Sequence, residues 1–199
     1  MHISHFIDSF SKSFPSHTTS LPWQITSRAA ELLFERIKQV SSDYHIRKGV
    51  AIHKDALVEE HVIFKGPLII SANCFIGAHA YLRGGVFLGD SVSIGPGCEV
   101  KSSFILPHSA LAHFNFIGDS LIGSHVNFEA GSIICNHFNE RTDKIIHVKH
   151  HNESIETGVT KFGALIGDHC KIGANAVLSP GTILKPGSIV KRLELISQT

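Results

Sequence analysis

The chain has 199 residues and an almost balanced charge, with 18 Lys and Arg against 17 Asp and Glu. This length suffices for one well-buried domain and is short for two. The balance excludes the basic surface on which counterion-driven nucleic-acid binding depends, and 43% hydrophobic residues argue against a disordered chain. No apolar run approaches the ~20 residues of a membrane span, and the N-terminus lacks the segments of a signal peptide. We therefore expect a cytoplasmic protein that binds neither nucleic acid nor membranes.

Residues 1–45 differ in pattern from the rest and are predicted to form an N-terminal extension. Thr26 or Ser27 is suited to cap the start of a helix there. Apolar residues follow at helical spacing: Ile25, Ala29, Leu32, Leu33, Ile37 and Val40. We expect one short amphipathic helix over about 26–40 that covers the open end of the repeat region.

From Ile46 onward, an apolar residue recurs at every sixth position. The series is Ile46, Ile52, Val58, Phe64, Ile70, Ile76, Leu82, Leu88, Ile94, Val100, Leu106 and Ala112. Because six is a multiple of the two-residue period of a strand, a short strand and a turn in each repeat would place one side chain inward at the same point each time. The period predicts an all-β fold, a parallel β-solenoid of hexapeptide repeats with three sides and eighteen residues per turn.

The six-residue period slips once and then stops. After Ala112 it gives way to a five-residue step between Ile117 and Ile122, and it ends at residue 135. Residues 135–165 begin with a polar run and are predicted to form a projecting loop, in which 144–148 is compatible with a strand.

The period returns at Ile166 and continues to Val190. The predicted organisation is therefore an extension over 1–45, a solenoid over 46–190 with the projecting loop 135–165, and a tail over 191–199. The cysteines form no C-x-x-C motif. Three of the four fall four residues after a position of the period, so we expect interior thiols in a reducing compartment: Cys74, Cys98 and Cys170.

The segment with the five-residue step carries a specific motif. It reads His113-Phe114-Asn115-Phe116-Ile117-Gly118-Asp119, then Gly123-Ser124-His125-Val126-Asn127-Phe128-Glu129-Ala130-Gly131, then Cys135-Asn136. These residues resemble the acetyltransferase domain of the bifunctional glucosamine-1-phosphate acetyltransferase and N-acetylglucosamine-1-phosphate uridyltransferase family. Residues 161–168 are similar to archaeal sugar-nucleotidyltransferase homologues of that family. The repeat pattern of the family covers about residues 46–190, and its specific motifs are found over about residues 80–190.

The resemblance implies a left-handed β-helix of the hexapeptide-repeat acyltransferase superfamily, assembled as a homotrimer with active sites between subunits. It implies a CoA-dependent N-acyltransferase whose substrate is a small molecule, an amino sugar phosphate or a nucleotide sugar. Acetyl-CoA or another acyl-CoA would be a co-substrate, and no tightly bound cofactor is expected. The chain lacks the Gly-rich nucleotide-binding segment of the uridyltransferase, so no uridyl transfer is expected.

Residue by residue, the resemblance implies catalytic, substrate-binding and cofactor-binding positions and no metal ligand. His113 falls on the family's general base, and Glu99 falls on an active-site carboxylate. The implied substrate-binding residues are Arg83, Lys101, Asn127, Asn136 and Lys144. The implied coenzyme A contacts are Ala130 and Ala174.

Two features depart from the family pattern. Phe116 stands where the family has a tyrosine three residues after the base, so a hydroxyl contact is lost. In the altered loop, Thr142 stands where the family has a lysine, and only Arg141 and Lys144 are nearby.

The implied chemistry is reasonable for these residue types. A sugar ammonium must lose a proton before its nitrogen can attack a thioester, and an imidazole with an ordinary pKa of ~6.5 suits that task near neutral pH. We expect Glu99 to fix the tautomer of His113. Arg83 and Lys101 are one eighteen-residue turn apart, so they would stack on one face as a two-cation patch for a phosphate.

Two alternatives compete with this hypothesis. A scaffold that kept the solenoid and lost the reaction would account for Phe116 and the altered loop. A metalloenzyme similar to the γ-class carbonic anhydrases is suggested by the H-x4-H spacing of His108 and His113, although Ala72 occupies the position of the third ligand. Most of the 15 histidines are expected to be surface residues without a catalytic role.

Overall fold

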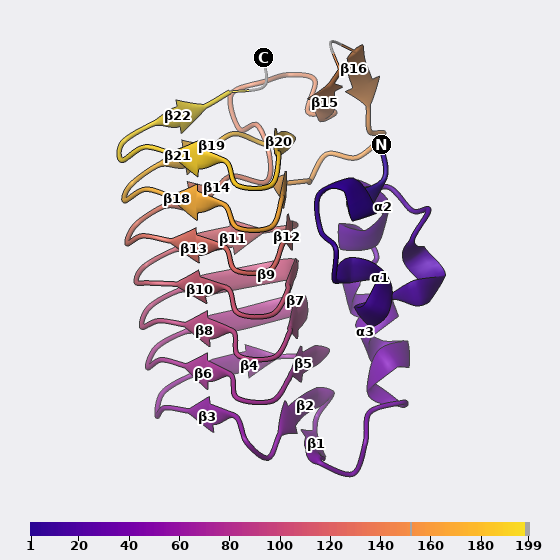
Figure 1. The fold of residues 1–199 in the computed structure, drawn as a ribbon, viewed down its shortest axis with the longest axis vertical. Coiled ribbons are helices and arrows are strands. Elements are labelled where there is room, and N and C mark those ends of the chain that lie inside the picture. Colours follow the sequence, from indigo (N-terminus) through magenta and orange to yellow (C-terminus); the bar gives the residue numbers. More distant parts are fainter. Residues whose placement is uncertain (152, 198–199) are drawn as a thin grey trace.

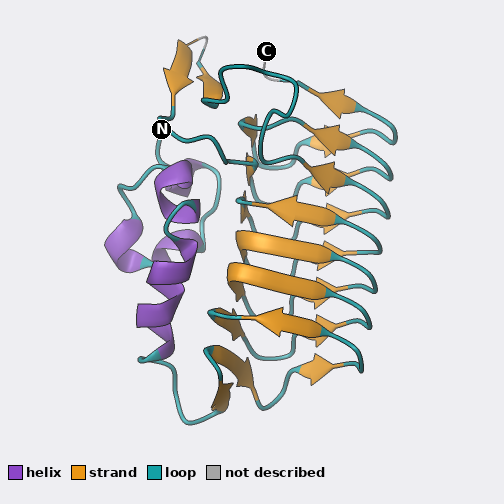
Figure 2. Cartoon of the chain, turned by 180° about the vertical axis from the view of Figure 1, so that it is seen from behind, coloured by secondary structure: helices purple, strands orange, loops and turns teal. Residues whose placement is uncertain are grey.

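The structure is a computed structural model that describes residues 1–151 and 153–197. Its main body is a parallel β-solenoid of about 8 turns, which confirms the predicted repeat fold. Short strands form three sides of the coil, and each strand pairs with its equivalents one turn away (Figure 1, Figure 2).

We number the sides in the order in which the chain meets them within a turn. Side 1 consists of β3 (Leu57–Val58), β6 (Phe75–Ile76), β8 (Ser93–Ile94), β10 (Ala110–Leu111), β13 (Asn127–Phe128), β18 (Lys171–Ile172) and β21 (Ile189–Val190). Side 2 consists of β4 (Ile63–Lys65), the first halves of β7 (Tyr81–Leu88) and β9 (Glu99–Ile105), β11 (Phe116–Gly118), β14 (Ile133–Ile134), β19 (Val177–Leu178) and β22 (Leu195–Ile196). Side 3 consists of β2 (Val50–His53), β5 (Leu68–Ile70), the second halves of β7 and β9, β12 (Leu121–Ile122), β17 (Ala164–Ile166) and β20 (Thr182–Leu184).

Aliphatic side chains fill the interior of the coil, each stacked on its equivalent in the next turn. Phe64 pairs with Leu82 and Leu82 with Val100, so that each of these turns contains eighteen residues. Val100 then pairs with Ile117, and Ile117 with Ile134, which are turns of seventeen residues. Burying one such side chain contributes about 1.5–3 kcal/mol, so the stack is the main source of stability in the coil.

The coil has two shortened steps, both between side 2 and side 3. The step from Ile117 to Ile122 lies where the sequence indicated, and the step from Val100 to Ile105 was not predicted. Ile105 therefore lies in the interior, and Leu106, expected there, packs into a second apolar cluster outside it. Sequence periodicity missed the first step because Ile105 and Leu106 are both apolar, so either register gives an unbroken pattern.

The N-terminal extension lies along side 3 rather than across the end of the coil (Figure 1). It contains η1 (Ile3–His5), α1 (Phe10–Ser13), η2 (Pro15–His17), α2 (Pro22–Thr26) and α3 (Ala29–Ile37). The helix expected over about 26–40 is α3, which begins three residues later and ends at Ile37, and a separate helix, α2, precedes it. α3 packs on β5, β7 and β9. At the open end, β1 (Tyr44–Arg47) pairs antiparallel with β2 instead.

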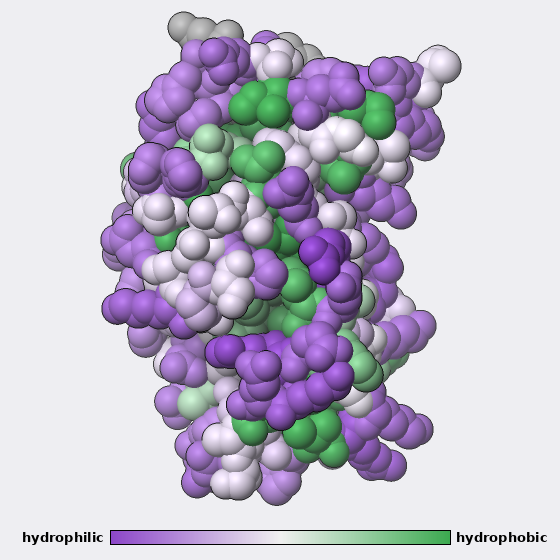
Figure 3. All heavy atoms as spheres, turned by 90° about the vertical axis from the view of Figure 1, so that its right-hand side faces the viewer, coloured by the Kyte–Doolittle hydropathy of each residue, from purple (hydrophilic) through white to green (hydrophobic). Residues whose placement is uncertain are grey.

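The extension packs on side 3 because the outward side chains of side 3 are apolar as well. These outward residues are Ile69, Phe87, Phe104, Leu121 and Leu165, all buried against residues of the extension. The Phe14 ring packs edge-on against Phe87 at 5.0 Å and against Phe104 at 5.1 Å between ring centroids. Much of the Phe content of the chain therefore lies between the coil and its cover. Figure 3 shows this face, where hydrophilic residues lie outermost and apolar residues show in the gaps between them.

The loop 135–165 folds back toward the extension. Its outer part is an antiparallel hairpin of β15 (His147–His150) and β16 (Glu153–Glu156), so the strand lies three residues later than the expected 144–148. Phe138, Ile146, Val148 and Phe162 are buried with residues of the extension. Trp23 contacts Phe162 at 5.8 Å between ring centroids.

The last strand of the coil, β22, lies within the predicted tail and pairs with β19. The solenoid strands therefore extend past Val190, while residues 198–199 of that tail lie outside the described residues. Among the described helices, none has the length and apolar character needed to cross a membrane.

Gly85 allows α3 to approach the coil. It has φ +95°, and a Cβ there would lie 2.5 Å from the Ala30 nitrogen and 2.9 Å from the Ala29 Cβ. We expect Gly85→Ala to lower the free energy of unfolding by about 2–3 kcal/mol, through overpacking together with backbone strain. Gly158 also has positive φ but has nothing within 4 Å of its Cβ position. Gly158→Ala therefore introduces backbone strain without overpacking, and it should lower the free energy of unfolding by about 1 kcal/mol. Urea unfolding of both variants measures the difference, and equal losses would contradict a close helix contact at Gly85.

Candidate active site

A row of cations crosses the outer surface of side 2. Lys65 on β4 is in register with Arg83 on β7, which is in register with Lys101 on β9. The predicted adjacency of Arg83 and Lys101 is confirmed. Lys65 was not singled out from the sequence, although it lies eighteen residues before Arg83 and the same spacing argument would have found it.

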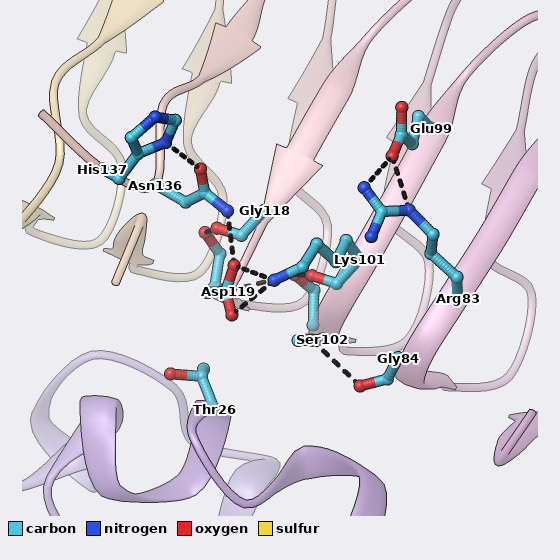
Figure 4. Close-up of polar contacts among 12 residues, drawn as sticks. Thr26, Arg83, Gly84, Glu99, Lys101, Ser102, Gly118, Asp119, Asn136 and His137 are labelled. Carbon is cyan, nitrogen blue, oxygen red and sulfur yellow. Dashed lines mark hydrogen bonds and ion pairs between the residues drawn. The ribbon is translucent and has the colours of Figure 1, made fainter. Parts of the chain in front are cut away.

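Each of the two predicted phosphate-binding cations has a carboxylate partner (Figure 4). Arg83 donates from Nε to Glu99 Oε1 at 2.8 Å and from a second guanidinium nitrogen at 2.6 Å. Lys101 Nζ donates to both carboxylate oxygens of Asp119, at 2.7 and 2.9 Å. The two cations are therefore already neutralised, and Lys65 adds a positive charge to this face.

Asp119 also joins Lys101 to Asn136 (Figure 4). Asn136 Nδ2 donates to Asp119 Oδ2 at 2.5 Å, and Asn136 Oδ1 lies 3.2 Å from His137 Nδ1. Gly118 makes room for this amide, because a Cβ there would lie 2.8 Å from Asn136 Nδ2. Two residues predicted separately thus belong to one hydrogen-bonded group, and their connection through Asp119 could not be predicted from the spacing of the repeats.

His113 lies at the corner between β10 and β11 and is exposed. Its carbonyl accepts a hydrogen bond from the Gly131 amide at 2.9 Å. Phe114 beside it has φ +53° and is 74% exposed, an unusual position for a large aromatic side chain. The expected contact between Glu99 and His113 is not formed among the described residues, since Glu99 binds Arg83 instead. The role of His113 stays a prediction.

The implied coenzyme A positions lie on neighbouring turns at the edge of side 1. The Ala130 carbonyl accepts from the Asn175 amide at 3.0 Å, and the Ala174 amide donates to Glu129 Oε2 at 2.9 Å. The nearby groove has a volume of about 660 Å³. It is lined by Asn127, Glu129, Lys171, Ile172, Gly173, Ile189, Val190, Lys191 and Arg192. Its three cations outnumber the one carboxylate, which makes the groove suited to an anion.

Asn127 and Lys144 are the remaining predicted substrate contacts. Asn127 projects from β13 on side 1, in register with Lys171, and is exposed at the groove rather than near Lys101. Lys144 is exposed in the loop ahead of β15, with no ion pair among the described residues. Within one chain, the predicted substrate residues are therefore divided between side 2, side 1 and the loop.

The thiols are poor candidates for nucleophilic chemistry. Burial raises the pKa of Cys74 to about 11, and it also raises the pKa values of Cys98, Cys135 and Cys170. A protonated, buried thiol is inert. The predicted interior position of Cys74, Cys98 and Cys170 is confirmed.

Several histidines lie at corners of the coil with positive φ: His61, His79, His108, His125 and His169. His108 stacks on His125 at 4.8 Å and His125 on His169 at 4.9 Å between ring centroids. His108 and His113 lie at opposite ends of β10, at different corners. In the described part of the chain, no three His, Cys, Asp or Glu side chains gather closely enough to hold a metal ion.

Glu129 and Arg192 connect two distant turns beside the groove. Arg192 donates two hydrogen bonds of 2.7 Å to the Glu129 carboxylate. These bonds, followed in importance by the Ala174 amide, hold the pKa of Glu129 below its usual range. A lowered pKa in the folded state contributes stability that is complete above the ordinary Glu pKa of about 4.3 and is lost as the pH falls through the folded value.

We therefore expect the wild type to have a higher urea midpoint than Arg192→Gln at pH 7, with the difference shrinking below about pH 4.3. Lys171→Gln removes a neighbouring cation that has no carboxylate partner among the described residues, and it should show no such pH-dependent difference. If the difference in urea midpoint between the wild type and Arg192→Gln were the same at pH 3 as at pH 7, the ion pair of Arg192 and Glu129 would not be its cause.

The family described as "Hexapeptide repeat of succinyl-transferase" matches residues 67–101 and 163–191. The bifunctional protein GlmU of Methanococcus vannielii is 31% identical over 166 residues, which are 80% of this chain and 39% of that protein. The bifunctional sugar-1-phosphate nucleotidylyltransferase/acetyltransferase of Sulfurisphaera tokodaii is 33% identical over 165 residues, which are 80% of this chain and 41% of that protein. The chain thus spans about two fifths of the length of these relatives.

A solved structure, the hexapeptide transferase family protein of Anaplasma phagocytophilum, is similar with a TM-score of 0.41 and 20% identity, covering 74% of each chain. The repeat fold, the family match and the archaeal relatives agree with one another. The chain is a hexapeptide-repeat β-solenoid protein, distantly homologous to GlmU and to the archaeal nucleotidylyltransferase/acetyltransferase.

Proposed function

We propose that the chain is a CoA-dependent N-acyltransferase that acts on an amino sugar phosphate or a nucleotide sugar, with His113 as general base. The observation that carries the proposal is the arrangement on side 2. Arg83 and Lys101 lie on successive turns of one surface, and Asp119 on the next turn links Lys101 to Asn136 one turn further on. His113 is exposed at the corner that leads into this surface. The name of the Sulfurisphaera tokodaii relative, which includes acetyltransferase, supports the reaction class.

In the proposed reaction, His113 accepts the proton that the sugar ammonium must lose. The free amine then forms a bond to the thioester carbonyl carbon and gives a tetrahedral intermediate. The carbon–sulfur bond breaks, the thiolate of coenzyme A leaves and takes up the second proton that the nitrogen must lose, and the amide forms. His113 releases the first proton to solvent. General-base catalysis of this kind contributes about 10²–10⁴-fold in rate.

A phosphate on the sugar would be recognised by the cations of side 2. Charge-assisted hydrogen bonds from Arg83 and Lys101 would form alongside their carboxylate partners, and Lys65 supplies charge that no acidic side chain in the described residues offsets. The ion pairs also hold the two cations in place before the ligand arrives, which reduces the entropy lost on binding.

The groove on side 1 suits the donor. Lys171, Lys191 and Arg192 give it a positive balance for the phosphates of acetyl-CoA or another acyl-CoA, with Ala130 and Ala174 at its edge. A homotrimer is part of the proposal. Sides 1 and 2 expose large apolar side chains, whereas side 3 is covered by the extension; the exposed ones include Leu57, Ile63, Phe114, Ile189 and Leu195. A neighbouring copy on these sides would complete the surroundings of His113.

Thiol release from acetyl-CoA, measured with a panel of amino sugar phosphates and nucleotide-linked amino sugars, tests the proposal. We expect His113→Ala to lower kcat by about 10²–10⁴-fold. His45→Ala, an exposed histidine on β1 at the far end of the coil, should have the rate of the wild type.

Equal rates for His113→Ala and the wild type would exclude His113 as the base. If neither acetyl-CoA nor a longer acyl-CoA raises the melting temperature of the wild type, the scaffold hypothesis replaces the enzyme hypothesis.

A further inference from the structure

Asp119, to which the sequence assigns no role, is buried and is held by hydrogen bonds of both its backbone and its side chain. It occupies a corner with φ +48°, and its side chain is only 7% exposed. Its amide donates to the Lys101 carbonyl at 2.8 Å, and its carbonyl accepts from the Gly163 amide at 2.9 Å. The backbone therefore fixes where the carboxylate points, and a buried carboxylate persists only where partners compensate its charge.

The carboxylate determines how the Asn136 amide is turned. Because Nδ2 donates to Asp119, Oδ1 must point the other way, and it lies 3.2 Å from His137 Nδ1. The position of Gly118 prevents a side chain from displacing the amide. Asn136 is only 7% exposed, and a ligand hydroxyl or N–H group that reaches this point beside His137 would meet an acceptor oxygen rather than an NH₂ group.

The same carboxylate determines where the charge of Lys101 lies. A free lysine side chain samples many rotamers, but Nζ is held here by both oxygens of Asp119. An ammonium has three protons, so one remains for a ligand oxygen. Arg83 is the in-register residue of the neighbouring turn, held in turn by Glu99.

We infer that Asp119 is a positioning residue for recognition of the sugar phosphate: it fixes the Lys101 ammonium for the phosphate and turns the Asn136 carbonyl oxygen toward a hydroxyl or N–H of the sugar. This inference rests on the proposed function and adds a specificity determinant to it. Asp119 would act through these two side chains and would not take part in the proton transfer.

Asp119→Asn is the direct test. Asn has the same size and tolerates positive φ, so the corner is kept. Its amide has one acceptor oxygen, and its NH₂ would face either the Lys101 ammonium or the Asn136 NH₂, both of which are donors. We expect the affinity for an amino sugar phosphate, measured by calorimetry, to fall on the order of tenfold or more. KM for that substrate should rise in parallel, while KM for acetyl-CoA stays within about twofold.

Asp168→Asn is a matched control. Asp168 is also buried, and its carboxylate accepts from the Asp8 amide at 2.9 Å and from the Ser124 amide at 2.6 Å, at a different corner. This variant should lower the melting temperature without changing the affinity for the sugar phosphate. If both variants lose sugar-phosphate affinity in proportion to their loss of stability, Asp119 is structural and the inference is overturned.

A double-mutant cycle identifies the route of the effect. If Asp119 acts through Lys101, the variant Asp119→Asn/Lys101→Met should lose less affinity than the product of the two single losses. If the double variant loses as much affinity as the product of the two single losses, Asp119 does not act through Lys101 and the inference is contradicted.

The outcomes also separate the inference from the proposed function. A wild type that binds the sugar phosphate but releases no thiol would remove the acyltransferase proposal and leave the positioning role to be tested by binding. A wild type that releases thiol with an unphosphorylated amine and binds no sugar phosphate would overturn the positioning role alone.

Discussion

The stacking of aliphatic side chains inside the coil determines where every other side chain lies. Each interior residue must lie over its equivalent, so the number of residues per turn sets which outward residues become neighbours. Turns of eighteen residues place Lys65, Arg83 and Lys101 in one row. The change to seventeen residues after Val100 brings Gly118 into the next place in that row. A glycine there leaves space beside Lys101, and the Asp119 carboxylate and the Asn136 amide occupy it.

The repeat fold could be predicted because the interior demands an apolar side chain at a fixed period, and such a demand appears directly in the sequence. The register of the middle turns could not be predicted, because Ile105 and Leu106 are both buried, one inside the coil and one beneath the extension. The position of the helices on the coil could not be predicted either. Periodicity shows which face of α3 is apolar, but only the assembled side 3, with Phe87 and Phe104 outward, offers that face a partner.

The candidate site was predictable to a similar degree. Spacing placed Arg83 next to Lys101, since one turn separates them. It did not predict the ion pairs. Glu99 lies two residues before Lys101 on β9 and binds Arg83 rather than His113, and Asp119 reaches Lys101 from a left-handed corner. The excess of histidine had a structural origin as well. Several series of corners with positive φ run along the coil, each repeating once per turn, and His108, His125 and His169 occupy one of these series and stack along it.

The attachment of the extension has a consequence for the order in which the molecule forms. The Asp168 amide donates to the Phe6 carbonyl at 2.9 Å, and the Asp8 amide donates to the Asp168 carboxylate, contacts between residues some 160 positions apart. A solenoid can grow turn by turn as its chain is made, since each turn needs only its predecessor. The extension is made first and cannot complete its contacts until the turn that contains Asp168 exists. The apolar outer surface of side 3 therefore stays without its full cover through most of synthesis, and closure of the N-terminal segment marks the completion of the fold.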